Sequence, residues 1–207
     1  MGTDVHGVWQ AKKDGMWVDI ESKWDQDRHY LLFSWLADVR NGFGFAGVPT
    51  YDPIKPIAER RGLPDDFQMD DGMHYTTLEA IDPGRREWAE EDKENGRYTA
   101  WLGSHSHSWL TADEILAAER LGSVHKHGVV TIEQFKAWDG KSTPEAWCGG
   151  VSGPGVEVAD SPASITPAST HVQIEWNMPD KLDYFVDEVR RLKELHGEVR
   201  LVFGFDS

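Results

Sequence analysis

Cysteine is almost absent, since Cys148 is the only cysteine among 207 residues. An intrachain disulfide is therefore excluded, and so is a zinc site built from several cysteines. A lone thiol is typical of a reducing compartment, so we expect a cytoplasmic protein. Long apolar runs are absent as well, and none approaches the roughly 20 residues of a membrane-spanning helix. The start, MGTDVHGVW, lacks the basic and apolar segments of a secretory leader, so neither a span nor a leader is expected.

Positive charge is also scarce. The chain has 21 Lys and Arg against 36 Asp and Glu, which gives a net charge of −15. Such a surface repels nucleic acid phosphates and anionic membranes, so we expect direct binding to neither. Two interpretations of the acidity stay open. It keeps the protein soluble, or it forms an acidic face that imitates DNA and occupies the groove of a DNA-binding host protein.

Aromatic residues are plentiful, and the 10 tryptophans and 8 phenylalanines indicate a packed globule. Within residues 5–20, apolar residues alternate with other residues on both sides of KKDG, which predicts a β-hairpin with its turn at KKDG. Residues 29–40 carry an apolar stripe at helical spacing, and we expect this helix to end at the NG of 41–42. Residues 97–102 resemble a short strand that leads into a His-rich loop at 105–111.

Two helix starts carry capping boxes. Thr111 is followed by Glu114 and Thr131 by Gln134, which predicts helices at about 112–121 and 132–138. The last part of the chain reads as strand, helix and strand, and its length permits a crossover between two parallel strands.

The order of elements predicts an α+β fold for one domain over 1–207. We expect a mixed sheet with an N-terminal hairpin, central helices and a C-terminal strand–helix–strand unit. Residues 41–77 are rich in Gly, Pro and Asp, and residues 147–170 are rich in Gly, Ser, Pro and Ala, which predicts two long ordered loops at about these positions.

Histidine pairs are the first candidate for chemistry. His105 and His107 are two residues apart, as are His125 and His127, and residues at this spacing share one side of an extended segment. Two imidazoles on one side bind a divalent metal such as zinc. Asp4 and His6 form a similar pair, so Asp4, His6, His105 and His107 are candidate ligands of a metal that activates water. Chance occurrence is the alternative, particularly for the pair at 125–127.

The stretch GSHSHSWLTADEIL (103–116) permits a second interpretation. The first backbone N–H groups of the helix after Thr111 lack partners within the helix, and such groups bind anions. A structural alternative is that the serines and histidines only cap the backbone of the loop. Four arginines extend the anion hypothesis, because a guanidinium binds phosphate with two hydrogen bonds. They are Arg28, Arg40, Arg60 and Arg61, and the alternative for each is an ion pair with Asp27, Asp38, Glu59 or Asp65.

Several motifs together resemble a family of small bacterial and phage proteins. The family opens with an MG-C-D-I-H-like motif and contains D-R-N-Y-D-L-F-like, R-G-L-P and H-S-x-S-W-L-T motifs. The matching stretches here are MGTDVH, DRHYLLFSWLADVRNG, PIAERRGLPDD, HSHSWLT, WCGGVSG and VRLVFGFD, which span nearly the whole chain.

The resemblance implies a single domain in an intracellular setting. Thr3 stands where the family usually has cysteine, and His107 stands where it often has Ala or Pro. The resemblance therefore favours His105, and not His107, as the partner of His6. The positions that match polar motif residues of the family are Asp4, His6, Arg28, Tyr30, Arg40, Asn41, Arg61, His105 and Ser106.

These observations predict a phage-type accessory protein, with a role in host takeover or counter-defence, that binds a small anionic, nucleotide-like ligand. Arg28, Arg40 and Arg61 would bind the anion, while His6 and His105 would act as base or metal ligands oriented by Asp4. Hydrolysis of a phosphoester is the expected reaction if the ligand is turned over. The alternative is a non-enzymatic acidic inhibitor that binds a host protein. The remaining predicted ligand-binding residues are Tyr30, Asn41 and Ser106.

Overall fold

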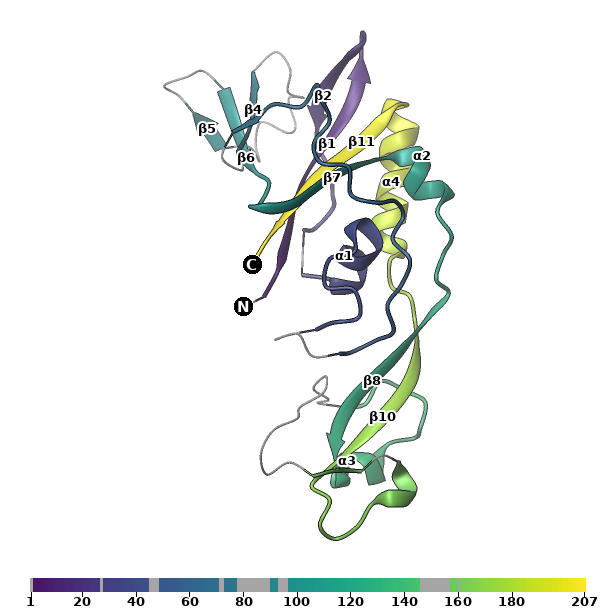
Figure 1. The fold of residues 1–207 in the computed structure, drawn as a ribbon. Helices are drawn as coiled ribbons and strands as arrows, with labels where there is room; N and C mark the ends of the chain where they lie inside the picture. The colour runs from purple at the N-terminus through teal and green to yellow at the C-terminus, as the bar shows by residue number, and fades with distance from the viewer. Residues whose placement is uncertain are drawn as a thin grey trace. The chain divides into compact units, whose positions relative to one another are not determined.

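The computed structural model divides the chain into two compact units (Figure 1). The larger unit contains Gly2–Val39, Pro56–Glu119 and Leu182–Ser207, and the smaller unit contains Arg40–Lys55 and Arg120–Lys181. The described residues are 2–26, 28–44, 49–70, 73–77, 90–92, 97–145, 157–159 and 161–207. Cys148 and most of the Gly-rich stretch that follows it lie outside these residues.

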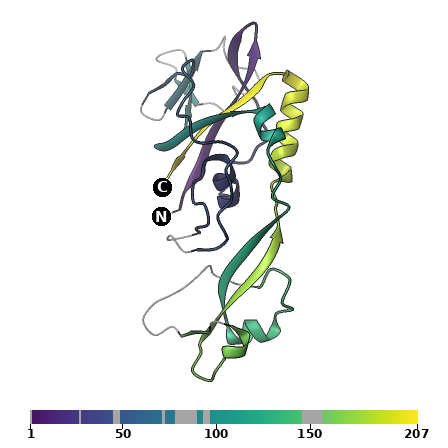
Figure 2. The ribbon, with the colours of Figure 1, turned by 45° about the vertical axis from the view of Figure 1, so that its right-hand side comes forward.

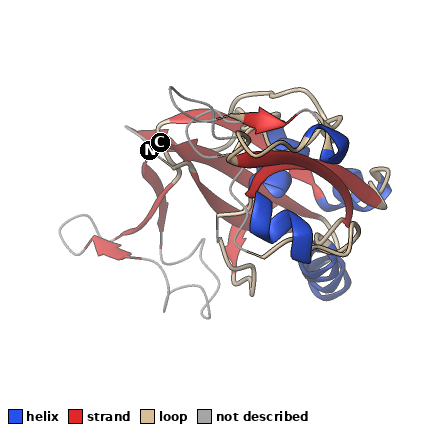
Figure 3. Cartoon of the chain, turned by 90° about the horizontal axis from the view of Figure 1, so that it is seen from below, coloured by secondary structure: helices blue, strands red, loops and turns tan. Residues whose placement is uncertain are grey.

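The predicted α+β class is confirmed, because both units contain helices and strands (Figure 3). That the two units form one domain stays a prediction. The elements of the larger unit are β1 (Asp4–Lys13), β2 (Met16–Ile20), α1 (Tyr30–Ala37), β3 (Met69–Asp70), β4 (Met73–Thr77), β5 (Glu90–Asp92), β6 (Arg97–Trp101), β7 (His105–Thr111), α2 (Ala112–Ala117), α4 (Asp183–His196) and β11 (Val199–Asp206). Those of the smaller unit are β8 (Ser123–Thr131), α3 (Ile132–Ala137), β9 (Val158–Ala159), a 3-10 turn (Pro162–Ser164) and β10 (His171–Pro179).

The larger unit is organised around an antiparallel sheet in the order β2-β1-β11-β7 (Figure 1). The predicted hairpin forms β1 and β2, and its turn consists of Asp14 and Gly15, both at positive φ, as a tight two-residue turn requires. The first and last strands pair from Asp4↔Asp206 to Ala11↔Val199, so the two ends of the chain lie side by side.

Both faces of this sheet are covered, which explains why β11 is buried from Val199 to Phe205 and is mostly apolar. On one face Trp9 contacts Phe185 of α4, and Phe205 contacts Phe33 of α1. On the other face a smaller cluster joins the sheet to the chain around Phe67. Its buried members are Val8, Phe67, Leu102 and Val202.

Helix α1 is shorter than predicted. Asp38 adopts a left-handed conformation, and its N–H bonds to the carbonyls of Phe33 and Ser34, so the helix ends before the predicted NG stop. All residues of α1 after Tyr30 are buried, so the expected apolar stripe is one side of a helix that is buried all round.

The two predicted capping boxes are confirmed. Thr111 accepts a hydrogen bond from Glu114 N while Glu114 accepts from Thr111 N, and Thr131 and Gln134 repeat the pattern. The helices that follow, α2 and α3, span six residues each and are shorter than expected. The segment before α2, which we expected to be a loop, is strand β7 at the edge of the sheet.

The C-terminal strand–helix–strand order is confirmed, and α4 buries an apolar stripe and ends at Gly197. Figures 1 and 2 show α4 beside β11 and α2. The two strands that flank α4 do not pair with one another, so the crossover that their spacing permits is not formed. Strand β11 pairs with β1 and β7, whereas β10 belongs to the smaller unit and pairs with β8 and β9. A helix between two strands permits a crossover, but each strand joins the sheet that buries its apolar residues.

The smaller unit contains a mixed sheet, in which β10 is antiparallel to β8 and parallel to β9. Val130, Val172, Ile174 and Trp176 form its buried cluster. The predicted long loops contain short regular elements. The first, at 41–77, includes β3 and β4, and the described part of the second includes β9 and the 3-10 turn.

Gly204 offers a test of the central sheet. A Cβ at this position would overlap the carbonyl oxygen of Leu102 and the His107 ring, whereas one at Gly62 has nothing within 4 Å. Both Gly204→Ala and Gly62→Ala are to be measured by urea unfolding. Because overpacking against backbone cannot relax, we expect Gly204→Ala to lose more than about 2 kcal/mol. Gly62→Ala should lose about 1 kcal/mol, through its positive φ alone. Equal losses would contradict the packing described for Gly204.

Candidate functional site

A β-bulge interrupts the pairing of β7 with β11. His105 pairs with Phe205 and Ser108 with Phe203, so Ser106 and His107 together face Gly204. Ser106 has φ 55°, the left-handed conformation that usually belongs to glycine at the first position of such a bulge. The bulge therefore decides where each residue of the HSHS motif lies.

The two histidines that sequence analysis combined lie on opposite faces of the sheet. His6 pairs with Gly204 and His105 with Phe205, and directly paired residues share a face. Gly204 and Phe205 are consecutive, so their faces are opposite. The predicted Asp4–His6–His105 site is therefore not assembled. Within the described part of the chain, no group of three or more His, Cys, Asp or Glu side chains is arranged to hold a metal ion.

His107 lies on the face of His6, since its ring occupies the space where Gly204 lacks a side chain. The prediction that His105, and not His107, is the partner of His6 was therefore wrong. The role of His107 is structural, because its Nε2 donates to the carbonyl of Gly103 over 3.1 Å. His6 Nε2 lies 3.2 Å from Asp206 Oδ2, and the His6 ring meets the edge of Trp101.

Asp4 and Arg28 bind one another with two hydrogen bonds of 2.9 and 2.8 Å. These bonds lower the pKa of Asp4 below its ordinary value and raise that of Arg28, and nearby Tyr30 adds to the effect on Arg28. A side chain on Gly2 would overlap the guanidinium, so the glycine makes room for this pair. Arg28 is therefore ion-paired with Asp4. Asp4 thus orients Arg28, whereas the sequence analysis expected it to orient His6.

Arg61 is also held by a carboxylate. Its Nη1 donates to Glu114 over 3.1 Å, its guanidinium lies over the Trp109 ring, and its backbone N–H donates to Ser108. The hydrogen bond with Arg61 is the largest of the effects that lower the pKa of Glu114 to about 2. Glu114 thus both closes the capping box of α2 and fixes the loop that carries Arg61.

Arg40 and Asn41 belong to the smaller unit, so the predicted arginine set is divided between the units. The Asn41 amide accepts from Ile54 N and donates to Ile54 O, while the Arg40 carbonyl accepts from Tyr51. These hydrogen bonds join the beginning of the segment 40–55 to its end and thereby stabilise it.

His125 and His127 lie on strand β8, not on a solvated turn. Asp52 contacts both rings, with 3.0 Å to His125 Nδ1 and 4.0 Å to His127 Nε2, and Glu175 lies 3.5 Å from His125 Nε2. Asp52 thus occupies Nδ1 of His125, and the other contacts pair these histidines with acidic side chains.

The group that does converge is Arg60, Ser106, His105 and Ser207. Arg60 Nη1 donates to Ser106 Oγ over 2.8 Å, and Ser106 Oγ lies 3.0 Å from His105 Nδ1. His105 Nε2 lies 3.4 Å from Ser207 Oγ, and the His105 ring stacks on buried Phe205. Arg60 is exposed, and no carboxylate among the described residues pairs with it. Sequence analysis named Arg60 as one of four candidate arginines but left it out of the predicted anion-binding set of Arg28, Arg40 and Arg61.

A buried polar network was missed. Asp19 Oδ2 contacts His74 Nε2 over 2.9 Å, and Asp19 Oδ1 accepts from Gln10, whose oxygen accepts from Arg200. Asp19, His74, Gln10 and Arg200 are each at most 5% exposed. Arg200 also binds Asp66, and its pKa is lowered by burial. The sequence signals this network only through polar residues at inward positions of mostly apolar strands, such as Gln10 in β1 and Arg200 in β11.

This network joins β1, β2, β4 and β11. The other nitrogen of His74 contacts the carbonyl of Gln68 over 2.8 Å, and the His74 ring stacks on Phe67 at 4.1 Å. Since each side chain is buried, removal of Asp19 leaves His74 Nε2 and the Gln10 amide without the carboxylate that they contact. We therefore assign the network to stability.

No family model, no curated protein and no solved structure matches this chain. The resemblance described above accordingly stays a prediction. Among the described residues no helix is long and apolar enough to cross a membrane.

Glu114→Gln tests the Arg61 pair. Glutamine keeps the capping box, as Gln134 does at α3, but removes the charge. The folded pKa lies below the unfolded value, so the carboxylate stabilises the fold above the unfolded pKa and loses this contribution as pH falls from about 4.5 toward about 2. Because the side chain is 35% exposed, we expect a loss of only about 1 kcal/mol near neutral pH.

The measurement is urea unfolding of both proteins over this acidic range and near neutrality. The difference between them should shrink as the pH falls. A difference that is independent of pH would show that Arg61 and Glu114 do not form this pair in solution.

Asp19→Asn tests the buried network. We expect a loss of about 3 kcal/mol in unfolding free energy, because His74 keeps a buried ring without its carboxylate. The matched control is Glu198→Gln, which removes the exposed pair with Lys12 and should cost less than about 0.5 kcal/mol. If both variants were equally stable in chemical denaturation, the network would carry no stability.

Proposed function

We propose that the protein is a cytoplasmic accessory protein that binds a small phosphate-bearing anion at Arg60, Ser106 and His105. The proposal rests on the surroundings of the Arg60 guanidinium. Its guanidinium is exposed and donates to a neutral hydroxyl, and no described carboxylate neutralises it. Other arginines bind carboxylates in their own unit, namely Arg28, Arg61, Arg120, Arg190, Arg191 and Arg200.

The chemistry of the three side chains suits a phosphate. A guanidinium presents a planar fork of donors that matches two phosphate oxygens, and Arg60 uses one of its donors on Ser106. The Ser106 hydroxyl and the His105 ring supply further donors at hydrogen-bond distance of one another. In a chain of net charge −15, an unneutralised guanidinium is the local attraction that an anion needs.

The resemblance to phage proteins supports the accessory role, and the lone cysteine supports a reducing compartment. The ligand class is a nucleotide or another phosphorylated metabolite. The competing hypothesis, an acidic inhibitor that imitates DNA, requires no anion site. Binding of a phosphate compound at Arg60 therefore separates the two.

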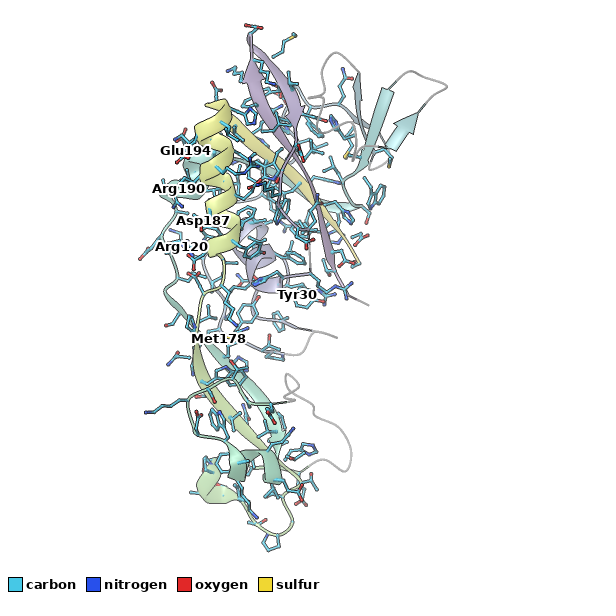
Figure 4. All side chains as sticks on the ribbon, turned by 180° about the vertical axis from the view of Figure 1, so that it is seen from behind. Tyr30, Arg120, Met178, Asp187, Arg190 and Glu194 are labelled. Atoms are coloured by element: carbon cyan, nitrogen blue, oxygen red, sulfur yellow. The ribbon has the colours of Figure 1, made fainter. Side chains whose placement is uncertain are left out.

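Isothermal titration of the full chain with AMP and with inorganic phosphate tests the proposal. We expect Arg60→Ala to weaken binding by about 10- to 100-fold, the usual value of a charged hydrogen bond. Arg60→Lys should recover only part of it, because lysine lacks the fork. The control is Arg190→Ala, which removes an exposed arginine from α4, where Figure 4 shows it between Asp187 and Glu194.

Two results would overturn the proposal. One is the absence of heat with either compound, and the other is equal affinity in the Arg60→Ala and Arg190→Ala proteins. The second result would place any anion elsewhere on the molecule.

A further inference from the structure

We propose that Ser106 is a nucleophile, with His105 as its general base, and that it attacks the phosphorus of a small phosphate monoester. The inference rests on the proposed anion site and adds turnover to it. Its geometry is that of an activated nucleophile: a hydroxyl in contact with a base, and the base in contact with a third group.

The hydrogen bonds provide a path for proton transfer from Ser106 to His105. Ser106 Oγ accepts from Arg60 Nη1 over 2.8 Å, so its single proton is available to His105 Nδ1 at 3.0 Å. His105 Nε2 faces Ser207 Oγ at 3.4 Å, and a proton on Nε2 that donates to this oxygen leaves Nδ1 as the acceptor. The contact with Arg60 also stabilises negative charge on Ser106 Oγ as the proton leaves.

The backbone at Ser106 is strained in the conformation that holds this arrangement. Ser106 occupies the left-handed conformation at φ 55°, in a bulge where glycine is the usual residue. A non-glycine residue in such a conformation is strained, and strain of this kind is concentrated at functional sites. The His105 ring is stacked on Phe205, which is completely buried, so the base is held against a rigid element. Both His105 and Ser106 are partly exposed and within reach of a ligand.

The reaction has two steps that balance. In the first, a bond forms between Ser106 Oγ and phosphorus, the Ser106 proton moves to His105 Nδ1, and the ester oxygen leaves as an alkoxide. In the second, water attacks phosphorus, the bond to Ser106 Oγ breaks, and Oγ recovers the proton from His105. One proton of the water neutralises the alkoxide, so the products are phosphate and an alcohol. Arg60 binds the non-bridging oxygens in both steps.

The experiment uses a fluorophosphonate probe, which reacts with activated serines, followed by peptide mass analysis. We expect the full-length protein to be labelled at Ser106 and to release p-nitrophenol from p-nitrophenyl phosphate. His105→Gln should slow labelling by about 10²- to 10⁴-fold, the usual contribution of a general base. Ser104→Ala is the matched control, because it removes a neighbouring serine outside the bulge, and it should be labelled as the unaltered protein is.

Ser106→Gly keeps the test independent of folding. Glycine adopts the left-handed conformation without strain, so this variant should melt at the same temperature or higher while losing both labelling and turnover. Labelling of another residue, or equal labelling of His105→Gln, would overturn the proposal. A protein that binds AMP through Arg60 but is neither labelled nor active would keep the proposed function and refute the nucleophile.

Discussion

The pairing of β1 with β11 is the interaction on which the larger unit depends. It joins residues about 200 positions apart in eight consecutive pairs, from Asp4↔Asp206 to Ala11↔Val199. Because helices α1 and α4 cover one face and the cluster around Phe67 covers the other, loss of this pairing would uncover both apolar surfaces at once. The buried network of Asp19, His74 and Arg200 fastens β2 and β4 to the same two strands.

The bulge opposite Gly204 determines which polar residues meet at the end of this sheet. Without it, His105 and His107 would share a face and approach the Asp4–His6 pair in the way that their spacing suggests. With the extra residue, His107 stays on the face of His6, where its Nε2 donates to the carbonyl of Gly103, and His105 moves to the opposite face. The bulge leaves His105 against Phe205 and places Ser106 in contact with Arg60. A strained backbone that positions a hydroxyl between a base and a cation is the basis of both proposals.

Local chemistry in the sequence predicted the parts of the fold that depend on a few adjacent residues. The capping boxes at Thr111 and Thr131 and the turn at Asp14 and Gly15 are of this kind, since each is formed within four residues. Contacts between distant segments could not be predicted in this way. The pairing of Arg61 with Glu114 and the register shift at Gly204 both depend on tertiary packing. The register shift alone separates His6 from His105, which the sequence had grouped.

The protonation pattern of His105 tests the central claim most directly. Long-range proton–nitrogen correlation by NMR identifies which ring nitrogen carries the proton at a pH where the imidazole is neutral. The account predicts a proton on Nε2, with Nδ1 as the acceptor of the Ser106 hydroxyl. A proton on Nδ1 would mean that His105 donates to Ser106, and this result would contradict the role of His105 as its base.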